Sequence, residues 1–259
     1  MLKIDKIKGL ILDMDGVLWR GSEAIGNLPA IFTRFHDRGW RIIMATNNAT
    51  RTISQYVDRL GEFGVVVEPW QIVNSAIAAA AFLREQFPKG GPVYLIGEDG
   101  LIEALNQQGF YQSEQDVIAV ISSMDRKVNY DKLRKATLLI RGGALFVATN
   151  PDRTFPAPEG LIPGAGAILA ALEAATYVKP VITGKPSPAM YHIALSRLGL
   201  SPSETLVVGD RAETDIAGAQ AIGCRTALVL SGVTSPDEAQ AWQPAPDLII
   251  EDLDTLSKL

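Results

Sequence analysis

Four short groups of polar residues each follow an apolar run that predicts a buried strand. They are Asp13-Met14-Asp15, Thr46-Asn47-Asn48, Lys185 in the stretch TGKPSP, and Asp210 with Asp215. The carboxyl ends of parallel strands meet at one edge of a sheet, where ligands bind. We therefore expect these groups to converge although they are far apart in the sequence.

Asp13 and Asp15 place two carboxylates next to Gly16, a residue that lets the chain turn sharply. Two nearby carboxylates repel each other, so they favour a bound divalent cation or one raised pKa. With a metal present, Asp13 can attack phosphorus as a nucleophile while Asp15 handles the proton of the leaving group. Taken alone, the pair has another explanation, because aspartates often begin turns.

Thr46, Asn47 and Lys185 are residue types that suit phosphate oxygens. A hydroxyl, an amide and loop N–H groups can donate hydrogen bonds, and an ammonium group offsets charge in phosphoryl transfer. Lys185 lies between Gly184 and Pro186, which would fix its backbone. The alternatives are a helix cap near Asn48 or Thr50 and a solvated surface lysine.

Asp210 follows a clean apolar run and precedes Asp215. Asp210 suits Mg²⁺, which prefers one or two carboxylates together with waters and substrate oxygens. Asp215 could join the metal, bind a metal water or position Lys185. Its alternative role is a favourable negative charge in the first turn of a helix.

The elements that position these groups alternate between strand and helix, which predicts an α/β fold with a parallel sheet covered on both faces. Strands are expected at residues 9–12, 41–45, 206–208, 226–230 and 248–250. Helices are expected at residues 27–38, 51–60, 188–198 and 214–222, with Asn27 and Ser187 as caps and Gly39, Gly199 and Gly223 at or beyond the ends.

The middle of the chain has strand and helix signals of its own, after a boundary at Pro88-Lys89-Gly90-Gly91-Pro92. Strands are expected at residues 93–96, 117–122 and 145–149, and helices at 100–108 and 130–136. We interpret residues 89–179 as a smaller α/β domain inserted between residues 1–88 and 180–259 of the main domain.

Composition excludes several classes of protein. The 259 residues are 47% hydrophobic and 20% charged, which is typical of a globular chain. A net charge of −5 does not favour nucleic acid or anionic membranes as partners. Cys224 is the one cysteine, so no internal disulfide can form, and the N-terminus lacks a signal-peptide core. We expect a soluble, cytoplasmic protein.

The four groups in this order resemble the motifs of the haloacid dehalogenase superfamily, here DMDGV, TNN, GKPSP and GDRAETDI. The resemblance implies a Rossmann-like core, an aspartyl-phosphate on Asp13 and Asp15 as general acid and base. It also implies that Thr46, Asn47 and Lys185 bind phosphate. Mg²⁺ would be held by Asp13, the backbone carbonyl of Asp15 and Asp210, with Asp215 in the outer shell.

The spacing of the motifs indicates a branch of that superfamily. Asp13 and Thr46 are 33 positions apart, whereas Thr46 and Lys185 are 139 apart. The extra domain therefore lies after the second motif and resembles a C2-type cap. The stretches DGVLWRG, MDRKVNYDKL, LFVATNPD and TALVLSGVTS are similar to the 4-nitrophenylphosphatase-like branch, subclass IIA.

The resemblance implies a phosphatase that acts on a small phosphorylated metabolite. The alternatives are a phosphotransferase or mutase of the same fold and a non-catalytic phosphometabolite-binding protein. Cap-to-cap dimers are common in the resembling branch, so a homodimer is an open expectation. The natural substrate and the roles of the cap residues Arg126, Asn150 and Asp152 are left open by the sequence.

Overall fold

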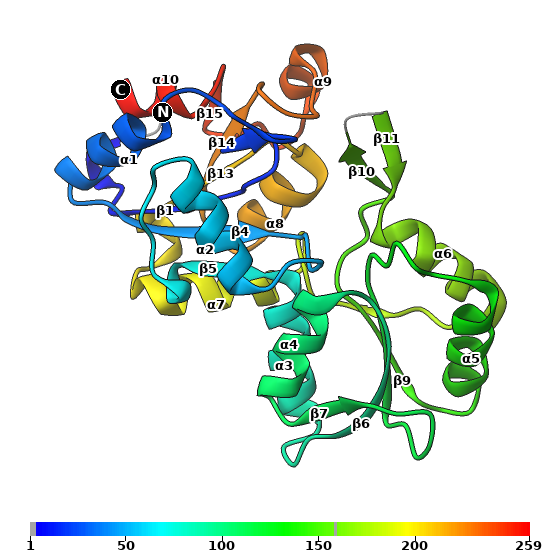
Figure 1. The fold of residues 1–259 in the computed structure, drawn as a ribbon. Helices are drawn as coiled ribbons and strands as arrows, with labels where there is room; N and C mark the ends of the chain where they lie inside the picture. The colour runs from blue at the N-terminus through cyan, green and yellow to red at the C-terminus, as the bar shows by residue number, and fades with distance from the viewer. Residues whose placement is uncertain (1–3, 158–159) are drawn as a thin grey trace. The chain divides into compact units, whose positions relative to one another are not determined.

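The computed structural model describes residues 4–157 and 160–259 (Figure 1). Residues 1–3, at the N-terminus where no signal-peptide core was found, lie outside the described residues. The protein divides into two compact units. The first contains Met1–Thr46, Ser54–Val73 and Lys185–Leu259, and the second contains Asn47–Ile53 and Asn74–Gly184.

A six-stranded sheet forms the centre of the first unit, in the order β15-β14-β13-β1-β4-β5. β1 is fully buried and pairs in parallel with β13 on one side and β4 on the other. Their ends are therefore aligned, with Leu12 opposite both Val208 and Met44. The strands are β1 (Gly9–Leu12), β4 (Arg41–Thr46), β5 (Ile72–Asn74), β13 (Thr205–Gly209), β14 (Arg225–Val229) and β15 (Leu248–Ile250).

The helices of the first unit largely follow the capping signals of the sequence. Asn27 caps α1, and its side chain accepts a hydrogen bond from the Ala30 N–H at 3.1 Å. Gly199 adopts a left-handed conformation at the end of α7. The elements are α1 (Leu28–Asp37), α2 (Ile53–Glu62, whose first residue is assigned to the second unit), α7 (Pro188–Leu198), α8 (Ala217–Ala221), α9 (Pro236–Ala241), α10 (Leu253–Lys258), the hairpin β2 (Trp19–Arg20) with β3 (Glu23–Ala24), and short 3₁₀ turns at Ile4–Lys6, Pro69–Gln71 and Pro202–Glu204.

The structure differs from the expected helix at residues 214–222. Ala212–Ile216 forms one π-helical turn, and only Ala217–Ala221 continues as the α-helix α8. The N–H of Ile216 donates to the Arg211 carbonyl five residues earlier, and the Asp215 carboxylate accepts from the Arg211 N–H at 3.0 Å. Such single π turns are frequent at functional sites.

The second unit has its own parallel sheet of five strands, in the order β12-β9-β8-β6-β7. Its strands are β6 (Gly91–Ile96), β7 (Phe110–Gln112), β8 (Ala119–Ser122), β9 (Leu145–Ala148) and β12 (Val181–Ile182). Its helices are α3 (Ser75–Gln86), α4 (Asp99–Gln107), α5 (Tyr130–Arg141) and α6 (Ala165–Thr176). An antiparallel hairpin, β10 (Thr154–Ala157) with β11 (Gly160–Pro163), precedes α6.

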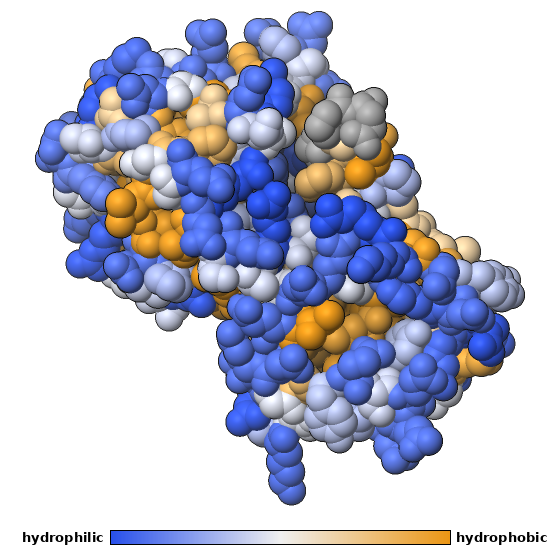
Figure 2. Space-filling model, in the orientation of Figure 1, coloured by the Kyte–Doolittle hydropathy of each residue, from blue (hydrophilic) through white to orange (hydrophobic). Residues whose placement is uncertain are grey.

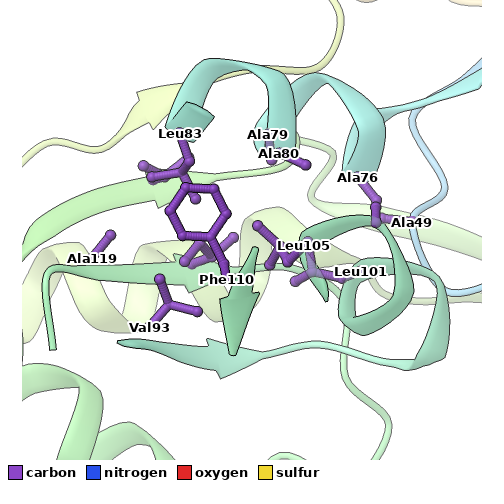
Figure 3. Close-up of a cluster of buried hydrophobic side chains, with 13 residues drawn as sticks. Ala49, Ala76, Ala79, Ala80, Leu83, Val93, Leu101, Leu105, Phe110 and Ala119 are labelled. Atoms are coloured by element: carbon purple, nitrogen blue, oxygen red, sulfur yellow. The ribbon is translucent and has the colours of Figure 1, made fainter. Parts of the chain in front are cut away.

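Alternating residues of this sheet face two separate cores. On one face, Val93 and Ile121 pack with Leu83 of α3 and Leu105 of α4 (Figure 3). On the other face, side chains of the same strands pack with α5 and α6; the buried members are Tyr94, Ile96, Val120, Phe146, Ala148, Ala136, Ile140, Ile168, Leu169 and Leu172. The second unit is therefore a three-layer α/β/α structure.

These sheets confirm the predicted fold class, because both are built from parallel strands linked by helices. The predicted inserted domain, residues 89–179, lies inside the second unit, and its boundaries stay a prediction. Within the described residues, no helix is both long and apolar enough to cross a bilayer. On the face drawn in Figure 2, hydrophilic residues cover most of the surface and hydrophobic residues gather in small groups.

Candidate active site

Asp13 and Lys185 form the centre of a buried ionic cluster in the first unit. Asp13 directly follows β1, and Lys185 begins the last segment of this unit. The Lys185 Nζ donates to Asp13 Oδ1 at 2.6 Å, to Asp215 Oδ1 at 2.6 Å and to the Ala45 carbonyl at 3.0 Å. Only 3% of Lys185 is exposed, so this lysine is aimed at the two carboxylates and is not solvated at the surface.

Asp210 and Asp215 complete the cluster. Asp210 follows β13, which lies beside β1, and Asp215 is held by the π-helical turn. The carboxylates of Asp13, Asp210 and Asp215 each offer an oxygen within 4.8 Å of the others. The structure thus brings together four of the residues that the sequence singled out, namely Asp13, Lys185, Asp210 and Asp215.

Two glycines leave room for the Asp210 carboxylate. A Cβ on Gly16 would lie 2.4 Å from Asp210 Oδ2, and a Cβ on Gly232 would lie 1.9 Å from the same oxygen. Gly16 also has a φ of +87°, a conformation that favours glycine. The neighbouring Val233 N–H donates to Asp210 Oδ2 at 2.8 Å and fixes the orientation of the carboxylate.

The cluster contains three carboxyl groups and one ammonium group. Burial raises the pKa of Asp13 well above its usual value, and Asp215 and Asp210 add to that shift while Lys185 opposes it. Burial and the Asp215 carboxylate raise the pKa of Asp210 to about 7. Burial by itself would lower the pKa of Lys185, but Asp13 and Asp215 outweigh it and raise that pKa well above the usual value. Lys185 therefore stays charged.

The donor set fits a hard divalent cation. Among the side chains that the structure describes, Asp210 Oδ1 is a buried oxygen with no hydrogen-bond partner. A buried acceptor without a partner is costly, and a cation would satisfy it. The cluster is made of carboxylate oxygens, which are the ligands that Mg²⁺ prefers. Bound Mg²⁺ would also offset the repulsion that raises the carboxylate pKa values.

Asp15 lies in the turn between β1 and the β2–β3 hairpin. The Gly16 N–H donates to the Trp19 carbonyl at 2.7 Å, and the Trp19 indole N–H donates to Asp15 Oδ1 at 2.9 Å. The Ser231 hydroxyl donates to the Gly16 carbonyl at 2.7 Å and ties this turn to the segment after β14. Asp15 is half-buried, and it therefore differs in environment from the buried Asp13.

Thr46 and Asn47 are consecutive but belong to different compact units. Thr46 is the buried last residue of β4. Asn47 begins the second unit, where its amide donates to Asp152 at 3.0 Å and its carbonyl accepts from Asn150 at 2.7 Å. Arg126 forms a two-pronged ion pair with Glu98. The roles of Thr46 and Asn47 in binding phosphate stay predictions.

Comparison with known proteins identifies the family. A model described as haloacid dehalogenase-like hydrolase matches residues 10–111, and one described as HAD-hydrolase-like matches residues 182–256. An acid sugar phosphatase of Staphylococcus aureus is 36% identical over 247 residues, which cover 95% of each chain. The chain belongs to the haloacid dehalogenase-like hydrolases.

Solved structures agree with this assignment. A p-nitrophenyl phosphatase from Archaeoglobus fulgidus has a TM-score of 0.91 at 34% identity, covering 97% of this chain and 98% of that one. A glycerol phosphate phosphatase from Mycobacterium tuberculosis, solved in complex with magnesium, also has a TM-score of 0.91 at 34% identity and covers 100% of this chain and 80% of that one. The predicted superfamily, the 4-nitrophenylphosphatase-like branch and the enzyme class of phosphatase are confirmed.

Some contacts that shape the site of this hydrolase were not predicted from the sequence. The Tyr191 hydroxyl lies 3.0 Å from the carbonyls of both Thr214 and Asp215, and it holds the π-helical turn from α7. Val233 contributes its backbone N–H, so the identity of its side chain gives no sign of the contact with Asp210. The Trp19 contact with Asp15 depends on the way the chain turns back after Gly16. These contacts had no clear signal in the sequence.

Proposed function

We propose that this hydrolase is a Mg²⁺-dependent phosphatase that cleaves small phosphomonoesters through an aspartyl-phosphate on Asp13. The observation that carries the proposal is the buried contact of Lys185 with Asp13 and Asp215, beside the unpartnered oxygen of Asp210. A binding protein has little need of a buried nucleophile with a charged partner. The family assignment supports a phosphatase.

In the proposed first step, the Asp13 carboxylate attacks phosphorus while Asp15 protonates the leaving oxygen of the ester. Lys185 offsets negative charge on the phosphoryl oxygens, and Thr46 and Asn47 donate hydrogen bonds to them. In the second step, Asp15 takes a proton from water, which attacks the aspartyl-phosphate and releases phosphate.

Asp13, the backbone carbonyl of Asp15 and Asp210 are the proposed Mg²⁺ ligands, and Asp215 orients Lys185 from the outer shell. Bound Mg²⁺ would supply positive charge near the transferred phosphoryl group. Asp215 fits the orienting role because its two oxygens are engaged by Lys185 and by the Arg211 N–H.

The proposed substrates are small phosphomonoesters, including sugar phosphates. The support comes from relatives named for acid sugar phosphates, p-nitrophenyl phosphate and glycerol phosphate. These names agree in one respect, because each describes the removal of phosphate from a small ester. The individual metabolite is not part of the proposal.

A phosphate-release assay over sugar phosphates, nucleotides, phosphoglycolate and pyridoxal phosphate, with and without Mg²⁺, tests the proposal. We expect Mg²⁺-dependent release, and a loss of at least about 1,000-fold for Asp13→Asn. Asp37→Asn changes an exposed carboxylate on α1 and serves as the matched control. Activity that survives chelation or Asp13→Asn would contradict the mechanism, and a phosphorylated isomer without free phosphate would indicate a mutase.

A further inference from the structure

Trp19 holds the proposed acid and base of this enzyme through a direct hydrogen bond. Its indole N–H lies 2.9 Å from Asp15 Oδ1, although the two residues are separated by a turn. The turn is closed by backbone bonds, because the Leu18 N–H donates to the Met14 carbonyl at 2.8 Å. The conformation of this turn therefore brings Trp19 next to the Asp15 carboxylate.

The indole ring itself is buried and is held by two neighbouring side chains. Trp19 is only 1% exposed, and its ring lies 5.8 Å from that of Phe63. The Arg59 guanidinium lies 4.6 Å from the centre of the Trp19 ring and also donates to the Gly21 carbonyl. A cation over an indole face is attracted to it, so Arg59 and Phe63 together restrict the ring to one orientation.

An immobile donor restricts the carboxylate that accepts from it. Asp15 is half-buried, and an aspartate side chain has several staggered rotamers in general. The bond from Trp19 engages Oδ1 and selects one of them, which gives the second oxygen, Oδ2, a defined position. Proton transfer requires this oxygen to be within hydrogen-bond reach of the leaving group.

We propose that Trp19, braced by Arg59 and Phe63, is a positioning residue that orients Asp15 for proton transfer to the leaving oxygen. This inference rests on the proposed function, and it adds a role for a residue that acts through its hydrogen bond to Asp15. The role concerns the proton and not the phosphoryl group. Its loss should therefore affect esters according to how much their leaving oxygen needs a proton.

Phenyl phosphate and 4-nitrophenyl phosphate provide the test, because they share a ring and differ mainly in the leaving oxygen. The nitrophenolate leaves readily without a proton, whereas the phenolate depends on the acid. We expect Trp19→Phe, which keeps a ring but removes the N–H, to lower kcat/KM for phenyl phosphate about 10-fold more than for 4-nitrophenyl phosphate.

Trp40→Phe is the matched control in the same unit. Trp40 is also buried, stacks on Phe35 at 5.5 Å and lies under the Arg38 guanidinium at 5.2 Å. Its replacement removes an indole of the same kind without a contact to Asp15. We expect it to change both esters by the same factor. Equal losses on both esters in Trp19→Phe would overturn the positioning role.

A spectroscopic measurement keeps the inference testable if Trp19→Phe fails to fold. Wild-type and Asp15→Asn proteins are both labelled with ¹⁵N and their indole resonances are compared. The Trp19 resonance should differ between them, because the acceptor loses its charge, while the Trp40 resonance should not. An unchanged Trp19 resonance would overturn the proposed contact. Wild-type protein that hydrolyses neither ester would instead overturn the proposed function, and with it the catalytic meaning of the contact.

Discussion

At the scale of single residues, Lys185 supplies the positive charge that compensates the buried carboxylates of the acidic cluster. It contacts two carboxylates at 2.6 Å while only 3% of it is exposed. Removing one partner of a buried ion pair costs far more than removing a surface pair, because the remaining charge is left without compensation. The stability of the fold and the proposed catalysis therefore depend on the same ammonium group.

We expect Lys185→Met to lower phosphate turnover at least about 100-fold and the free energy of unfolding by about 3 kcal/mol. Steady-state kinetics and denaturant unfolding measure the two effects. Lys179→Met removes an exposed lysine that pairs with Glu173 and should change neither quantity measurably. A Lys185→Met enzyme of normal activity would contradict the proposed role.

Cys224 is expected to be chemically inert in the folded protein. It is buried, and burial raises the pKa of its thiol to about 12. Since the thiolate is the reactive form, alkylation by iodoacetamide at pH 8 should be slow in native protein and rapid in denaturant. Mass spectrometry of the labelled protein measures both rates, and rapid labelling of the native protein would refute the prediction.

At the scale of elements, the site depends on loops that approach the Asp210 carboxylate closely. Gly232 is the clearest case, because a Cβ there would lie 1.9 Å from Asp210 Oδ2. Its backbone conformation would accept alanine, so the constraint comes from the carboxylate and not from φ. Sequence alone cannot reveal such a constraint, since the glycine is 22 positions from the aspartate that it accommodates.

We expect Gly232→Ala to displace the Asp210 carboxylate and raise the Mg²⁺ concentration needed for half-maximal activity by about 10-fold, since crowding of this kind costs about 1–3 kcal/mol. Titration of activity with Mg²⁺ measures the change. Gly61→Ala is the control, because Gly61 lies in α2 with nothing near its Cβ. It should instead add about 0.5 kcal/mol of stability. An unchanged Mg²⁺ requirement in Gly232→Ala would count against the proposed site.

Helices and strands were predictable where the apolar pattern and the capping residues indicated the same element. β1 and β15 have the expected bounds, and α1 and α7 begin and end within a residue of their caps. The hairpin β10–β11 was missed because prolines at 156, 158 and 163 argue against strands. α6 was missed because its sequence, AGAILAALEAAT, has no regular polar face. The π-helical turn was missed because its bonds depend on Tyr191 and Asp215.

For the candidate site, the sequence predicted which residues come together but not the detailed contacts between them. The ends of parallel strands predicted that Asp13, Asp210 and Asp215 would approach one another, and their oxygens do so. Geometry that depends on returning loops, such as the bond from Trp19 to Asp15, was not predictable. Contacts of this kind join residues through tertiary structure, which periodicity and spacing do not encode.

At the scale of the whole molecule, metal binding should be visible as added stability. A ligand that binds only the folded protein stabilises it by about 2.7 kcal/mol at 100 times its dissociation constant. We expect Mg²⁺ to raise the midpoint of thermal unfolding of the wild-type protein and to have little effect on Asp210→Asn. Calorimetry with and without chelator measures the shift. An equal shift in both proteins would place the bound ion elsewhere.

The division of the chain has a consequence for the evolution of this enzyme. Asp13, Asp15, Lys185, Asp210 and Asp215 all belong to the first unit, whereas residues 74–184 form one continuous stretch of the second. That stretch has its own sheet with a hydrophobic core on each face. A gene segment of this kind can diverge, or be exchanged between relatives, without altering any of the five charged residues. New specificities can therefore arise while the proposed reaction chemistry is inherited intact.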